Sequence, residues 1–204
     1  MTNKVETIEQ LEALYSGGLA EATLRKETPC INAEYRQLIE AAPFFAIASI
    51  GPEGMDCSPR GDGPGFVKIL DECTVAFPDR RGNNRLDTLR NIVVDPRVAL
   101  LFLIPGWNET LRINGTAHLT TDGDLLERFE VKGRRPVTAV IVKIDTMYFQ
   151  CARALKRAAL WDVSAQVDPK NLPSAGRLVQ SVMQEFDAED YDAKLHERQA
   201  RTLY

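Results

Sequence analysis

Residues 58–85 read SPRGDGPGFVKILDECTVAFPDRRGNNR and hold two short apolar runs between two clusters rich in arginine and glycine. The apolar runs, 66–70 and 74–77, predict two antiparallel strands joined by a tight turn. Such a hairpin brings the end of the first cluster close to the start of the second. Because arginine forms charge-assisted hydrogen bonds with phosphate, this pattern predicts an anion site, and a solvated turn with spare arginines is the alternative.

The second cluster leads into a predicted helix. Asn84 is a residue type that caps helix N-termini, and apolar residues recur at helical spacing over 86–93. The N–H groups at the start of a helix and the helix dipole attract anions. We therefore expect Asn84 to cap a helix whose first turn faces the anion.

The remaining chain predicts a mainly β fold (α+β) with appended helices. Short turns join most of the predicted strands, which favours an antiparallel barrel over a doubly wound parallel sheet. The run 98–104 is apolar throughout and predicts burial on both faces. Further strands are predicted at residues 44–50, 55–59, 97–104, 109–119 and 136–149, and helices at 5–15, 32–43, 122–131, 152–161, 175–186 and 188–204.

Length and composition limit the class of protein. The 204 residues, 44% hydrophobic and 26% charged, match one globular domain. A net charge of −4 argues against a nucleic-acid partner, because a phosphate backbone requires a basic surface. A polar start and the absence of a long apolar segment predict a cytoplasmic protein with no membrane partner.

Several common catalytic sites do not match the sequence. The glycines of 61–65 lack the third glycine of a dinucleotide fingerprint and lead into a strand. The sequence has two histidines, and His118 falls on the outward register of its predicted strand, so a histidine-based triad and a zinc site are not expected. A cofactor would therefore have to carry any reaction.

The order of these motifs resembles that of the pyridoxamine 5'-phosphate oxidase-like flavoproteins, and within them a bacterial FMN-dependent subgroup. The resemblance covers residues 41–161 and rests on the motifs at 58–62, 75–79, 81–85, 91–92, 95–98 and 112–115. It implies an antiparallel split β-barrel of Greek-key type, a homodimer, and FMN in a groove between the subunits. Residues 1–40 and 162–204 are then N- and C-terminal helical extensions of the same structural domain.

The resemblance also implies which residues bind the cofactor. Arg85 and Asn84 are the first candidates for binding the FMN phosphate, and the guanidinium of Arg60 is a second phosphate-binding group. Backbone groups near Val75 and Phe77 would edge the flavin ring. Lys156 and Trp161 would close the site from the partner subunit. The full set of candidates is Ser58, Arg60, Val75, Phe77, Arg81, Asn83, Asn84, Arg85, Lys156 and Trp161, with no catalytic residue and no metal ligand assigned.

The expected function is that of an FMN-dependent oxidoreductase acting on an unidentified small molecule. The chain lacks the Ser-Arg-Lys phosphate turn of the true pyridoxamine phosphate oxidases, so vitamin B6 is not the expected substrate. One alternative is a non-catalytic FMN-binding or stress-related protein. The other is a haem or deazaflavin binder on the same barrel.

Overall fold

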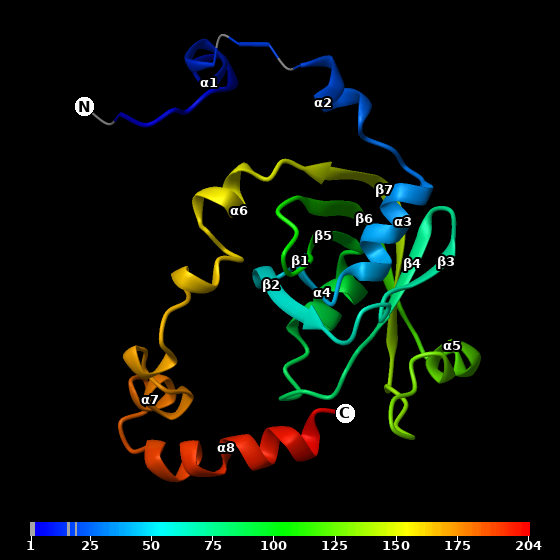
Figure 1. Ribbon diagram of the computed structural model, residues 1–204. Helices are drawn as coiled ribbons and strands as arrows, with labels where there is room; N and C mark the ends of the chain where they lie inside the picture. The colour runs from blue at the N-terminus through cyan, green and yellow to red at the C-terminus, as the bar shows by residue number, and fades with distance from the viewer. Residues whose placement is uncertain (1–2, 16, 19) are drawn as a thin grey trace.

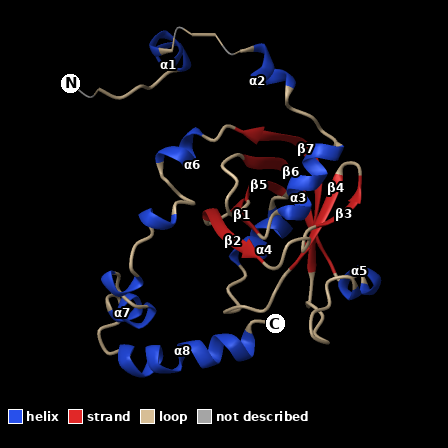
Figure 2. Ribbon diagram, viewed as in Figure 1, coloured by secondary structure: helices blue, strands red, loops and turns tan. Residues whose placement is uncertain are grey.

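A computed structural model describes residues 3–15, 17–18 and 20–204. In this part of the chain seven strands form one antiparallel sheet with the order β2-β1-β5-β6-β7-β4-β3 (Figure 2). The predicted antiparallel split barrel with appended helices is confirmed. The strands are β1 (Phe44–Gly51), β2 (Gly54–Gly61), β3 (Lys68–Asp71), β4 (Thr74–Pro78), β5 (Arg97–Leu103), β6 (Thr110–Thr120) and β7 (Ala139–Gln150).

The sheet is rolled into a barrel around an aromatic core. In a flat sheet β1 and β4 would lie roughly 19 Å apart, because three strands separate them and neighbouring strands are about 4.8 Å apart. The ring of Phe45 on β1 nevertheless lies 4.9 Å from that of Phe77 on β4, centre to centre. Phe45 also contacts Phe66, which belongs to the loop between β2 and β3, and Phe102 on β5. This contact between distant strands closes the barrel beside the loop that follows β2.

A bulge bends the longest strand pair. The register between β6 and β7 shifts between Asn114 and Gly115. A Cβ atom at Gly115 would lie 2.1 Å from the carbonyl oxygen of Lys143, so no other residue fits there without moving the backbone. A β-bulge therefore lies at Gly115.

The outer face of β1 and β5 is apolar and only half-buried. Alternate residues of β5 point into the core, whereas Ala99, Leu101 and Leu103 point outward. They pair across the ladder with Ala48, Ala46 and Phe44 of β1 in that order. The prediction that 98–104 is buried on both faces is therefore wrong for the single chain.

Some of the helices pack on this barrel, and others extend away from it. Helix α4 packs against β1, β2 and β6, and α3 packs against β6. Figure 1 shows α6, α7 and α8 leaving the barrel along one side, with the C-terminal end returning beside it. The helices are α1 (Ile8–Leu14), α2 (Glu21–Arg25), α3 (Ala33–Ala41), α4 (Asp87–Val94), α5 (Gly123–Glu127), α6 (Arg153–Arg157), α7 (Ala175–Gln180) and α8 (Ala188–Thr202). None of the helices described has both the length and the apolar character needed to cross a membrane.

Candidate functional site

A cavity of about 800 Å³ lies where β2 ends, where the chain leaves β4, and where it enters β7. Both arginine and glycine clusters of 58–85 contribute to its wall. The structure therefore brings together five of the candidate residues, and they are Arg60, Arg81, Asn83, Asn84 and Arg85. The other lining residues are Pro59, Gly61, Phe66, Pro78, Asp79, Arg80, Gly82, Leu86, Arg134, Arg135, Pro136, Val137 and Tyr204.

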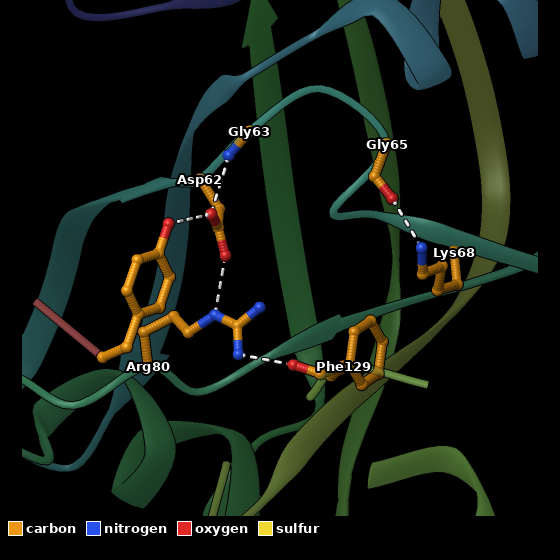
Figure 3. Close-up of polar contacts among 7 residues, drawn as sticks. Asp62, Gly63, Gly65, Lys68, Arg80 and Phe129 are labelled. Carbon is orange, nitrogen blue, oxygen red and sulfur yellow. Dashed lines mark hydrogen bonds and ion pairs between the residues drawn. The ribbon is translucent and has the colours of Figure 1, made fainter. Parts of the chain in front are cut away.

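A buried ion pair holds three segments together at this cavity (Figure 3). Arg80, just after β4, donates through Nε to Asp62 Oδ2 at 2.7 Å and through Nη1 to the carbonyl oxygen of Phe129 at 2.7 Å. The side chain of Asp62 is 7% exposed, and that of Arg80 is 18% exposed. The pair thus fixes the end of β2, the exit of β4 and the chain after α5 relative to one another.

The carboxylate of Asp62 receives three hydrogen bonds. Besides Arg80, the backbone N–H of Gly63 and the hydroxyl of Tyr204 donate to its Oδ1 atom, at 2.7 and 2.8 Å. Burial by itself would raise the pKa of Asp62, but the hydrogen bonds from Tyr204, Gly63 and Arg80, with the charge of Arg80, outweigh burial and lower the pKa. Asp62 is therefore an anion at neutral pH.

Five arginines besides Arg80 line the cavity and give it a cationic wall, namely Arg60, Arg81, Arg85, Arg134 and Arg135. Arg85 is hydrogen-bonded to Asp87, and its side chain is 77% exposed. Arg135 pairs with two glutamates at the rim. Arg60 and Arg81 form no ion pair with any described residue, so their charges remain available to an anionic ligand.

The lining also includes apolar residues. Phe66, Pro78 and Pro136 are buried side chains of the wall, and Leu86 and Val137 are exposed at the rim. Asp79 also lines the cavity. Burial raises the pKa of Asp79, while the positive charge of Arg60 acts in the opposite direction. The cavity therefore offers both cationic and apolar groups to one ligand.

The lining holds few groups that catalyse reactions on their own. Among the described lining residues there is no histidine, cysteine, serine or lysine. The remaining polar groups are arginines, two asparagines, an aspartate and a tyrosine. Such groups bind and orient an anion, and a bound cofactor is needed for oxidation or reduction.

The expected cap at Asn84 is wrong. Helix α4 begins at Asp87, its N-cap is Leu86, and no side chain caps it. Asn84 has a φ of 59°, in the left-handed region that asparagine tolerates, and the side chain of Asn83 accepts a hydrogen bond from the backbone N–H of Arg85. Residues 83–85 therefore form a local turn instead of the first turn of a helix. Asparagine favours such turns as well as helix N-caps, so the residue type alone does not distinguish the two.

A protein-family comparison identifies the fold family. The model of the pyridoxamine 5'-phosphate oxidase family matches residues 31–151, which is more than half of the chain. The chain belongs to the pyridoxamine 5'-phosphate oxidase family. The matched segment contains the barrel and every cavity residue except Tyr204.

Solved structures with similar folds share little sequence with this family member. HupZ of Group A Streptococcus is 19% identical, with a TM-score of 0.47, and the match covers 58% of this chain and 93% of HupZ. A candidate pyridoxamine 5'-phosphate oxidase of Lactobacillus delbrueckii is 19% identical, with a TM-score of 0.45 and coverage of 59% and 95%. An FMN-binding protein of Syntrophomonas wolfei is 11% identical, with a TM-score of 0.41 and coverage of 57% and 88%. No curated protein matches the sequence.

The other candidate residues of this family member lie outside the cavity lining. The hydroxyl of Ser58 donates to Asp56, which also accepts from Thr88 of α4. The side chains of Val75 and Phe77 are fully buried in the core, so only their backbone groups remain for a ligand. Lys156 lies in α6, and Trp161 Nε1 donates to the carbonyl oxygen of Trp107 at 2.7 Å. Within one chain, the segment that follows α6 therefore contacts the turn after β5, and neither Lys156 nor Trp161 lines the cavity.

The charged residues and the tyrosine of the site that were not among the candidates are Asp62, Asp79, Arg80, Arg134, Arg135 and Tyr204. Asp62 lies in the first arginine and glycine cluster and Arg80 in the second. The opposite charges of these two residues were the signal that could have predicted their pairing. Tyr204 lies 142 residues from its partner Asp62, and no local pattern marks it.

Proposed function

We propose that this member of the pyridoxamine 5'-phosphate oxidase family is a cytoplasmic FMN-binding homodimer that acts as an oxidoreductase on a small molecule. The observation that supports this proposal is one cavity lined by both arginines and apolar side chains. Its volume of about 800 Å³ falls within the roughly 300–1,000 Å³ typical of ligand sites. FMN combines a phosphate with a flat, mostly apolar ring system.

The residues present fit this cofactor. Arg60, Arg81 and Arg85 would hold the phosphate through charge-assisted hydrogen bonds. Phe66 and Pro136 would face the flavin ring and exclude water from it. When bound, the flavin supplies the hydride and electron chemistry, and the protein supplies position and electrostatics.

The cavity lining fits haem less well than it fits a flavin. Haem iron needs an axial His, Cys, Met or Tyr ligand. The lining residues described include no histidine, cysteine or methionine, and the hydroxyl of Tyr204 is bound to Asp62. The arrangement therefore favours a flavin over haem.

An absorption spectrum of the purified protein tests the proposed cofactor. We expect the two visible bands of a flavin, and bleaching of both bands when NADH or NADPH is added without oxygen. A Soret band would contradict FMN. Flavin bands that neither nicotinamide bleaches would favour a non-catalytic FMN-binding protein.

The homodimer is proposed because the described residues of the chain leave the apolar face of β1 and β5 only half-buried. Leu101 lies at the centre of this face, opposite Ala46. Covering such a face removes apolar surface from water, and a second copy of the chain presents the same face.

The variant Leu101→Asp tests this interface. We expect the wild type to scatter light as a dimer at micromolar concentration and Leu101→Asp to scatter as a monomer, because the carboxylate would lose its water in the interface. Val93→Asp is the matched control, since Val93 is an exposed apolar residue of α4, 72% accessible. A monomeric wild type would contradict the proposal.

Lys156 and Trp161 would close the cavity of the opposite subunit in this dimer. If so, Trp161→Phe changes the fluorescence of bound FMN, because an indole next to a flavin quenches it. Trp107→Phe is the control, since Trp161 bonds only to the backbone of Trp107. Unchanged flavin fluorescence together with a lower melting temperature would show that Trp161 only anchors α6.

A further inference from the structure

Tyr204 follows α8 and reaches the cavity from outside the family's matched segment. Its hydroxyl donates to Asp62 Oδ1 at 2.8 Å, and Arg134 donates to its backbone oxygen. Asp62 is itself fixed by Gly63 and Arg80. The position of Tyr204 is therefore set by a buried, charged anchor and not by loose surface contact.

The aromatic ring of Tyr204 lies near two cations. The guanidinium carbon of Arg80 is 5.5 Å from the ring centre, and Lys132 Nζ is 5.6 Å from it. These distances are within the range of cation–π attraction. The ring therefore has favourable contacts in the wall even before a ligand binds.

Tyr204 forms part of the wall without filling the cavity. The cavity keeps its volume of about 800 Å³ with Tyr204 in place, and Tyr204 lines it together with Arg60, Arg81 and Arg85. Tyr204 therefore belongs to the surface that a ligand in the cavity would meet.

The same contacts attach a surface arm to the cavity. Helix α8 is 15 residues long, packs on α7, and has one buried residue, Ala188, at its start. Its far end is tied to the barrel through Tyr204. Docking of this end of α8 and binding of a ligand in the cavity therefore involve the same residue, Tyr204.

We propose that Tyr204 is a positioning residue for the flavin, which it contacts through its ring, and that flavin binding and docking of the end of α8 stabilise each other. This inference rests on the proposed FMN binding. The two effects must be reciprocal: if docking of Tyr204 raises the affinity for flavin, bound flavin must stabilise the docked Tyr204 by the same factor.

Titrations with FMN and riboflavin test the ring contact. Tyr204→Ala should weaken both ligands by roughly tenfold and leave their affinity ratio unchanged, because the ring contact does not involve the phosphate. Tyr204→Phe keeps the ring but loses the hydroxyl that donates to Asp62, so it should weaken both ligands by less than Tyr204→Ala does, again with an unchanged ratio. Leu203→Ala is the control, because Leu203 is the exposed neighbour of Tyr204, 62% accessible, and is not part of the lining.

Amide hydrogen exchange of 188–204 provides a readout that does not depend on activity. FMN should slow exchange at the end of α8 most in the wild type, less in Tyr204→Phe, and not in Tyr204→Ala. Unchanged flavin affinity in Tyr204→Ala, or an effect on FMN alone, would overturn the inference. A wild type that binds neither flavin would overturn the proposed function first, and this inference with it.

Discussion

Replacing Arg80 by leucine is expected to lower the free energy of unfolding by about 3 kcal/mol, because it leaves the carboxylate of Asp62 buried without its cation. The loss is large because the side chain of Asp62 is 7% exposed and Arg80 also bonds to the carbonyl oxygen of Phe129. Urea unfolding at neutral pH measures the change.

Two variants make this result specific. Arg97→Leu removes the Arg97–Asp95 pair, in which the arginine side chain is 71% exposed, and should cost less than about 1 kcal/mol. The double variant Asp62→Asn Arg80→Leu should cost less than the sum of the two single changes, since it leaves no unpaired charge. Equal losses for Arg80→Leu and Arg97→Leu would contradict the importance of burial.

The same pair predicts a pH dependence. The pKa of Asp62 is lowered in the fold, so its stabilising contribution is complete above the ordinary carboxyl pKa of about 4 and is lost as the pH falls through the lower, folded value. The difference in stability between wild type and Asp62→Asn should therefore be constant near neutral pH and shrink in acid. A difference that grows in acid would contradict this sign.

The second large effect is expected for Arg85→Ala. Loss of one charge-assisted fork to the FMN phosphate should weaken FMN by about tenfold to a hundredfold, equivalent to roughly 1.5–3 kcal/mol. Riboflavin lacks the phosphate and should bind the variant as it binds the wild type. Fluorescence titration of the apo protein with each ligand gives the affinity ratio.

Arg90→Ala is the matched control for Arg85→Ala. Arg90 is an exposed arginine of α4 that does not line the cavity, so its removal tests the effect of net charge alone. The exposed ion pair between Arg85 and Asp87 must open or be shared when phosphate binds. An unchanged ratio of FMN to riboflavin affinity in Arg85→Ala would exclude Arg85 as the phosphate anchor.

Local patterns in the sequence were enough to predict the strands and the convergence of the two arginine clusters. Alternating apolar residues set the register of β6. The helix predicted from residue 32 is α3, and Asn32 caps it by accepting a hydrogen bond from the backbone N–H of Tyr35. The apolar runs of 58–85 became β3 and β4, which place Arg60 and Arg81 at one cavity. These features depend on neighbours within a few residues.

The features that were missed depend on distant or alternative partners. Asn84 matched a cap by residue type, but the adjacent Asn83 forms a competing turn with Arg85. The contact between Tyr204 and Asp62 joins residues that are 142 positions apart in the chain, so no periodicity in the sequence marks it. Leu101 is likewise only half-buried in the single chain, and its full burial would require a second chain.

Titration of the apo wild-type protein with FMN tests most directly whether the arginine-lined cavity is a flavin site. Saturable binding of one FMN per chain is expected, with micromolar or tighter affinity and with weaker binding of riboflavin. Arg60→Ala and Arg81→Ala should each lower the FMN affinity in the same assay. No saturable binding of FMN, or equal affinity of the wild type for FMN and riboflavin, would contradict the proposed site.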